Sequence, residues 1–221
     1  MIITIDGPAG AGKSSVSRRL AGELGFTYLD SGAMYRALAL YMLEKGVDIE
    51  DEDQVIEHLK EVEISFNNSS IHLNSRDVSD LIRTPEIDAA SSAVSRIPAV
   101  RKRLTELQRK IGETGNIVAE GRDMGTVVFP EADFKFFLTA SPEERARRRM
   151  DQAARTKKNI IKYEIILQQI KKRDKADSTR EIAPLKAADS AFVIDSTDLS
   201  FEEVVKKILG IIRKEGESGK D

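Results

Sequence analysis

The residues best suited to chemistry stand near the start of the chain, where the segment GPAGAGKS runs from Gly7 to Ser14. It has the spacing G-x-x-x-x-G-K-[ST] of a loop that binds phosphate groups. Its glycines let successive backbone N–H groups turn inward around an anion. In such a loop Lys13 reaches the outer phosphates, and the Ser14 hydroxyl binds Mg²⁺. We expect the Lys13 side chain to be exposed before the phosphates bind.

The neighbouring residues give this loop the context that its chemistry needs. Ile2, Ile3 and Ile5 predict a buried strand before it, and 15–24 predict a helix after it. The start of that helix would present its positive dipole end and open N–H groups to the same anion. A glycine-rich turn without function is the alternative. The residues expected to bind ATP here are Gly7, Pro8, Ala9, Gly10, Ala11, Gly12, Lys13, Ser14 and Ser15.

Arginines form the second chemical signal. Three lie on one predicted helix and two follow later, with Asp177 between these two: Arg145, Arg148, Arg149, Arg173 and Arg180. Two phosphorylated substrates held together repel each other, by about 4 kcal/mol for a pair of charges at 4 Å and an effective dielectric of 20. The planar guanidinium group can bind two phosphate oxygens at once through two hydrogen bonds, so arginines can offset this repulsion. For Arg148, which we assign to ATP, a solvated helix face is the alternative.

Polar residues also follow two of the predicted strands. Asp30-Ser31-Gly32 follows the second strand, and Glu120-Gly121-Arg122-Asp123 follows the third. Glu120 is a candidate partner of Mg²⁺, and a capping or ion-paired carboxylate is its alternative role. The two histidines, His58 and His72, stand away from the strand ends. A phosphate acceptor is already ionised near neutral pH, so a site without a base favours phosphoryl transfer to a phosphate over transfer to an alcohol.

The apolar pattern predicts an α/β fold. Five short apolar runs without strict alternation predict buried parallel strands: 2–5, 27–29, 117–119, 134–138 and 192–194. Eight segments between and after them have helical patterns: 15–24, 33–45, 53–61, 85–95, 98–111, 142–154, 162–172 and 201–214. Arg173, Asp177 and Arg180 would then follow a helix. We predict a three-layer α/β/α domain with a five-stranded parallel sheet and ligands at the carboxyl ends of its strands.

Two stretches interrupt this alternation. Residues 62–67 and 70–74 predict a small hairpin, and the basic segment Arg155–Asn159 predicts a flap. We therefore expect a single domain over 1–221, with an inserted subdomain for the acceptor over about 62–97 and a lid over about 150–165. The tail from Lys214 is expected to fray.

The composition narrows the class of protein. The 35 basic and 37 acidic residues give a net charge of -2, so nucleic acid and anionic membranes are not expected partners. There is no cysteine, and no apolar run is long enough to span a membrane. We expect a cytoplasmic monomer.

The chain resembles the bacterial cytidylate kinase family, which has the nucleoside monophosphate kinase fold. The resemblance runs nearly end to end and is most specific in the block GRDMGTVVFP from Gly121. The other segments that carry it are ITIDGPAGAGKSS from Ile3, LDSGAMYRALAL from Leu29, VSDLIRTPEI from Val78, ERARRR from Glu144 and IKKRDKADSTREIAPLKAADSAFVIDST from Ile170. It implies transfer of the γ-phosphate of ATP, with Mg²⁺, to CMP and dCMP. The alternatives are a nucleotide-driven switch or motor and another small-molecule kinase, such as a uridylate kinase.

The resemblance also implies roles for particular residues. Those that match positions holding the acceptor phosphate are Ser31, Arg36, Arg122 and Arg180. Those that match positions reading the cytosine are Ser92, Arg101 and Asp123. Those that match positions near the ribose and phosphate are Tyr35, Arg173 and Asp177. The expected catalytic residues are Lys13, Arg122, Arg173 and Arg180, and the expected metal partners are Ser14 and Glu120.

Overall fold

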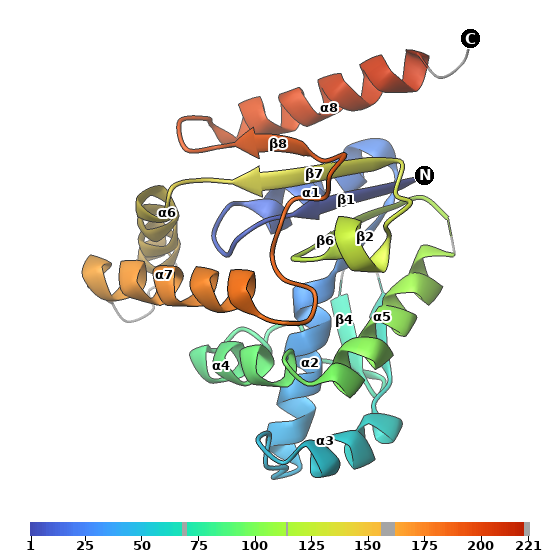
Figure 1. Cartoon of the computed structure of the whole chain (residues 1–221), viewed down its shortest axis with the longest axis vertical. Coiled ribbons are helices and arrows are strands. Elements are labelled where there is room, and N and C mark those ends of the chain that lie inside the picture. The colour runs from blue at the N-terminus through green and yellow to red at the C-terminus, as the bar shows by residue number, and fades with distance from the viewer. Residues whose placement is uncertain (68–69, 114, 156–161, 219–221) are drawn as a thin grey trace. The chain divides into compact units, whose positions relative to one another are not determined.

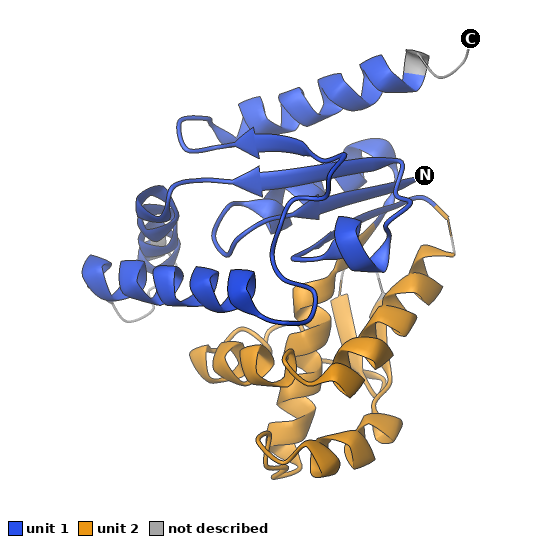
Figure 2. Ribbon diagram, viewed as in Figure 1, with its two compact units in different colours: residues 1–27, 116–221 blue, residues 28–115 orange. Residues whose placement is uncertain are grey.

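The computed structural model describes residues 1–67, 70–113, 115–155 and 162–218. The chain divides into two compact units, shown in Figure 2: unit 1 holds residues 1–27 and 116–221, and unit 2 holds residues 28–115. The insertion expected over 62–97 falls within unit 2. Residues 156–159 of the expected flap, and 156–161 of the expected lid, lie outside the described residues.

The central sheet confirms the five predicted strands. They are β1 (Ile2–Asp6), β2 (Thr27–Asp30), β6 (Ile117–Gly121), β7 (Phe134–Thr139) and β8 (Phe192–Asp195), in the spatial order β2-β6-β1-β7-β8. β1 pairs in parallel with β6 and β7, and β7 pairs in parallel with β8. Ile3, Ile5 and Phe136 are at most 1% exposed. Because parallel strands are buried on both faces, their apolar runs do not alternate, which is the pattern that predicted them.

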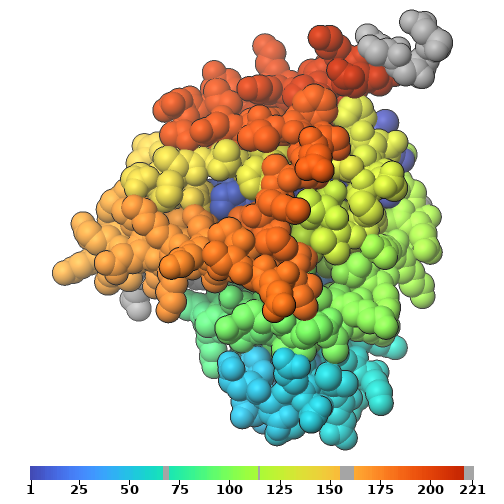
Figure 3. All heavy atoms as spheres, in the orientation of Figure 1, coloured from blue at the N-terminus to red at the C-terminus, as the bar shows by residue number. Residues whose placement is uncertain are grey.

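The described residues of unit 1 form the α-helices α1 (Lys13–Leu24), α6 (Pro142–Arg155), α7 (Tyr163–Thr179) and α8 (Phe201–Ser218), and a short π-helix, Met124–Val128. α1 packs on β1 and β6 and against α8, while α6 and α7 pack on each other around Ala146, Ile166 and Ile170 (Figure 1). In Figure 3, dark-blue spheres from the first part of the chain reach the surface between the yellow and orange segments of this unit.

Two predicted boundaries in unit 1 were wrong. α7 continues to Thr179 rather than ending at Lys172, so Arg173 and Asp177 lie on the helix, and Arg180 is its C-cap. The charged run KKRDKAD consists of good helix formers, apart from Asp, and contains no glycine or proline to end the helix. α8 likewise continues to Ser218, past the residue from which fraying was expected.

Unit 2 contains α2 (Ser31–Glu44), α3 (Glu52–His58) with the short helix Leu59–Glu61, α4 (Pro85–Val94) and α5 (Pro98–Gly112). The predicted hairpin is present as β3 (Ile64–Asn67) and β4 (Ser70–Leu73), and β5 (Arg76–Asp77) adds a third antiparallel strand. No described helix in either unit has the length and apolar character that crossing a membrane requires.

Candidate active site

The backbone of the phosphate loop requires glycine at defined positions. Gly7 has φ 147°, and a Cβ atom built on it would lie 1.9 Å from the carbonyl oxygen of Leu138. Gly12 has φ 94° and stands directly before α1. Only glycine adopts such angles readily, so other side chains would strain the loop. Because Gly12 has no side chain with which to cap α1, the first N–H groups of the helix can bind an anion.

The Lys13 side chain is buried, contrary to the expectation that it is exposed. It is 6% exposed, and its Nζ atom donates a hydrogen bond to the carbonyl oxygen of Pro8 at 2.8 Å. Burial, together with the nearby Arg122 and Arg173 guanidinium groups, lowers the pKa of Lys13 to about 7, although the Glu120 and Asp6 carboxylates act in the opposite direction. The lysine is therefore folded back onto its own loop, beside two of the predicted phosphate-binding arginines.

Two buried carboxylates lie at the ends of the strands next to this lysine. Asp6 ends β1 and is 4% exposed, and Glu120 in β6 is equally buried. Burial raises the pKa of Asp6 to about 6, while backbone hydrogen bonds from Gly125 and Met124 oppose the rise. Sequence reasoning missed Asp6, although it directly precedes the phosphate loop at a strand end.

The residues predicted after β6 make direct contacts with residues predicted on α7 and at its C-cap. The Nε atom of Arg122 donates to Oδ2 of Asp177 at 2.9 Å, and both side chains are at most 20% exposed. Nη2 of Arg180 lies 3.8 Å from Oδ1 of Asp123, whose side chain is buried. Together with the effect of Arg173 on Lys13, these contacts bring the expected catalytic residues of unit 1 together.

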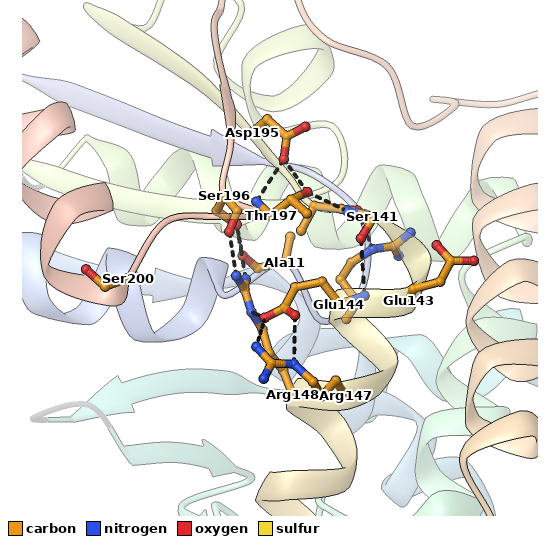
Figure 4. A network of polar contacts seen from close by, with 12 residues as sticks. Ala11, Ser141, Glu143, Glu144, Arg147, Arg148, Asp195, Ser196, Thr197 and Ser200 are labelled. Carbon is orange, nitrogen blue, oxygen red and sulfur yellow. Dashed lines mark hydrogen bonds and ion pairs between the residues drawn. The ribbon is translucent and has the colours of Figure 1, made fainter.

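Arg145 and Arg148 hold the phosphate loop from the side of its carbonyl groups. Arg145 is 3% exposed and donates to the carbonyl oxygens of Ala9 at 3.1 Å and Ala140 at 2.9 Å. Nη1 of Arg148 donates to Oγ of Ser196, which in turn lies 3.5 Å from the carbonyl oxygen of Ala11 (Figure 4).

The rest of the Figure 4 network anchors Arg148. Nε of Arg148 donates to Glu144 at 2.8 Å, and Nη2 donates to the carbonyl oxygen of Ser196 at 2.5 Å. Arg148 is therefore partly buried within a polar network and is not on a solvated helix face. Beside the network is a cavity of about 810 Å³, lined in part by Glu144, Met150, Tyr163 and Thr197.

The predicted residues of unit 2 lie at the start of α2, near the end of α4 and near the start of α5. Asp30 caps α2 by accepting from the Ala33 N–H at 2.8 Å, and its other oxygen accepts from Arg36 at 3.3 Å. Arg101 is 5% exposed, and its guanidinium carbon lies 5.7 Å from the centre of the Tyr35 ring. Ser31 is buried in the first turn of α2, and Ser92 is partly exposed on α4.

Comparison with known proteins identifies the family. A model of the cytidylate kinase family matches residues 3–214 of the 221. The chain belongs to the cytidylate kinase family. The match covers every residue that the sequence singled out in both units, and it confirms the resemblance based on the block that starts at Gly121. As a member of the cytidylate kinase family, the protein is an enzyme.

Two relatives within the cytidylate kinase family are similar over almost their whole length. The cytidylate kinase of Caldanaerobacter subterraneus subsp. tengcongensis is 51% identical over 212 residues, which cover 96% of this chain and 94% of that protein. The cytidylate kinase of Carboxydothermus hydrogenoformans is 51% identical over 221 residues, which cover 98% of this chain and 99% of that protein. The solved shikimate kinase from Bacteroides thetaiotaomicron has a TM-score of 0.52 at 13% identity, over 96% of this chain and 98% of that one, a likeness of fold alone.

Proposed function

We propose that this protein transfers the γ-phosphate of ATP to CMP and dCMP, giving ADP and the corresponding diphosphate. The observation that carries the proposal is the buried Lys13 of the phosphate loop, whose Nζ atom donates to the carbonyl oxygen of Pro8 at 2.8 Å, together with Arg122 after β6, which Asp177 holds at 2.9 Å. Arg122 directly precedes Asp123, the residue proposed to read the base. One strand end therefore supplies a cation for phosphate and a carboxylate for cytosine.

Charge neutralisation would be the main contribution of the protein. Phosphoryl transfer needs reactants held in line and stabilisation of charge on the transferred group, with little covalent help. Lys13, Arg122 and Arg173 would supply positive charge in unit 1, with Arg180 following α7. The ion pair of Arg122 with Asp177 fixes the direction of the guanidinium before the substrate binds.

Acceptor recognition divides into three tasks. Ser31 and Arg36, with Arg122 and Arg180, would bind the phosphate of CMP. Tyr35, Arg173 and Asp177 would contact the ribose and phosphate. The cytosine offers an exocyclic amino donor beside two acceptor atoms, so Asp123 would accept from the amino group while Ser92 and Arg101 donate to the acceptors.

The protein oxygen atoms near the phosphate loop fit an Mg²⁺ ion that binds together with ATP. Among the described residues, no group of three or more His, Cys, Asp or Glu side chains is arranged to hold a metal alone. Mg²⁺ in such enzymes takes one or two protein oxygens and completes its shell with phosphate oxygens and water. The exposed Ser14 hydroxyl and the Glu120 carboxylate would be those protein groups. When bound, the ion neutralises phosphate charge.

An activity screen tests the proposal directly. Purified protein would be incubated with ATP and Mg²⁺ and, in separate reactions, CMP, dCMP, UMP, dTMP, AMP or shikimate, with ADP release followed by a coupled assay. We expect ADP release to depend on CMP or dCMP. Release that is independent of any acceptor would instead favour a nucleotide-driven switch, and dependence on UMP alone would favour a uridylate kinase.

A further inference from the structure

The carboxylate of Asp6 accepts two hydrogen bonds from the backbone of a distant segment. Its Oδ1 atom accepts from the backbone N–H of Met124 at 2.8 Å, and its Oδ2 atom accepts from the N–H of Gly125 at 2.7 Å. Both oxygens of this buried side chain therefore bind consecutive backbone N–H groups. The two residues that donate lie 118 and 119 positions after Asp6 in the sequence. These residues follow Asp123 directly.

The segment that follows Asp123 is also held by its own short π-helix, Met124–Val128, of which Asp123 is the N-cap. The carbonyl oxygen of Asp123 accepts from the N–H groups of Val127 at 2.9 Å and Val128 at 3.1 Å. A Cβ atom on Gly125 would lie 2.9 Å from Oγ1 of Thr4, so the start of this helix is pressed against β1. The carbonyl group of Asp123 and the N–H groups of the next two residues are therefore all held by defined partners.

We propose that Asp6 is a positioning residue for base selection, which holds the Asp123 carboxylate in the orientation that distinguishes cytosine from uracil. The inference rests on the proposed function, since it assigns base reading to Asp123. Asp6 would touch neither the base nor the phosphates. It acts through the backbone of residues 123–125.

The chemistry of a carboxylate explains why Asp6 suits this position. An ionised carboxylate accepts with both oxygens, whereas an amide accepts with one oxygen and donates from its nitrogen. In Asp6→Asn, the amide nitrogen would face a backbone N–H, and a buried donor would lose its acceptor. The start of the π-helix at residues 124–125 would shift to relieve this, and the Asp123 side chain would shift with it.

Asp133 supplies a matched control within the same unit. Its Oδ2 atom accepts from the backbone N–H of Ile2 at 2.6 Å, at the opposite end of β1. Asp133→Asn therefore makes the same chemical change to a carboxylate that also binds a backbone N–H. It does so at the amino end of the strand, where β1 begins.

The test compares kcat/KM for CMP with kcat/KM for UMP at pH 8 in the wild type, Asp6→Asn and Asp133→Asn. We expect the CMP-to-UMP ratio to fall by about tenfold or more in Asp6→Asn, since selectivity built on polar pairing is lost when the pairing is disturbed. The ratio in Asp133→Asn should stay at the wild-type value. An unchanged ratio in Asp6→Asn would overturn the proposal, whatever happens to kcat.

A second measurement keeps the inference separate from the proposed function. Hydrogen exchange of the Met124 and Gly125 amides in the ligand-free protein should be slow in the wild type and in Asp133→Asn, and fast in Asp6→Asn. Slow exchange in Asp6→Asn would contradict the positioning role even if the protein phosphorylated no pyrimidine nucleotide. Should Asp6→Asn fail to fold, Asp6→Glu, which displaces the carboxylate by one methylene, should show the same changes, and wild-type values there would overturn the proposal.

Discussion

Arg145 and Asp174 form a two-pronged ion pair that joins α6 to α7. Nη1 of Arg145 lies 2.9 Å from Oδ1 of Asp174, and Nη2 lies 2.6 Å from Oδ2. The same guanidinium donates to the carbonyl oxygen of Ala9 in the phosphate loop. One buried side chain therefore connects that loop to the helix that carries Arg173 and Asp177.

Removing the carboxylate of this pair should destabilise the protein. In Asp174→Ala, the Arg145 charge would stay buried without its counterion, which typically costs about 3–5 kcal/mol. Because the Asp174 side chain is 25% exposed, water can compensate in part, and we expect a loss of about 2 kcal/mol in the free energy of unfolding. Urea denaturation followed by circular dichroism would measure it.

The control is a second ion pair between the same two helices. Nζ of Lys171 lies 3.0 Å from Oε1 of Glu143, and both side chains are more than half exposed. Lys171→Ala should leave the unfolding transition unchanged, because exposed ion pairs contribute little to stability. Equal effects of the two substitutions would refute a special role for the buried pair.

The two ion pairs also show what the sequence could and could not predict. The run ERARRR predicted a helix rich in arginine, and its resemblance to the cytidylate kinase family placed it near ATP. Nothing in the spacing separates Arg145, which is 3% exposed, from Arg147 two residues later, which is 66% exposed in its side chain. Burial depends on which face of α6 packs against the loop and α7, and a run of like charges has no apolar period to reveal that face.

Strand and helix positions were predictable because local patterns determine them. The five apolar runs and the phosphate loop were each found where expected, since burial on both faces of a parallel sheet leaves a continuous apolar signal. β5 was missed because it has two residues and follows an Asn74-Ser75 turn, in which both residues have positive φ. The usual sequence signal for such a turn is Asn-Gly, and this chain has serine where that signal has glycine.

Asp6 shows the corresponding limit for the candidate site. A single Asp at the end of β1 has no sequence neighbour that indicates its role, because its partners Met124 and Gly125 are more than a hundred residues away. The residues proposed to contact substrate stand in short recognisable motifs. Residues that act through the backbone of another segment become visible only when the fold brings the two segments together.

Lys13→Ala should abolish most activity while the protein remains folded. The change removes the cation that the loop offers to the outer phosphates, and we expect a loss of about 3 kcal/mol in transition-state stabilisation, roughly a hundredfold in rate. Lys13→Met, which refills most of the buried volume, should show the same loss with an unchanged unfolding transition. Near wild-type turnover in either folded variant would contradict the role of the loop.

Binding of ATP should take up a proton near neutral pH. The pKa of Lys13 is lowered to about 7 in the ligand-free protein, and a bound phosphate would raise it by favouring the charged form. Affinity for ATP should therefore fall as the pH rises from 7.5 towards 9, a range in which the phosphates are already ionised, their last pKa being about 6. Calorimetry in buffers of different ionisation enthalpy would measure the uptake. In Lys13→Arg, which stays charged, the pH dependence should disappear, and an equally steep dependence there would assign the proton to another group.

Asp123→Asn should weaken the preference for CMP over UMP by changing the group that meets the base. The carboxylate can accept from the amino group of cytosine, whereas uracil presents a carbonyl oxygen there and meets an unfavourable charge. An amide can donate to that carbonyl, so kcat/KM should fall for CMP and hold or rise for UMP, with a combined change in the ratio of about tenfold or more. Steady-state kinetics with both nucleotides at saturating ATP would measure the ratio. An equal loss towards CMP and UMP would mean that Asp123 supports the site through its neighbour Arg180, 3.8 Å away, and does not read the base.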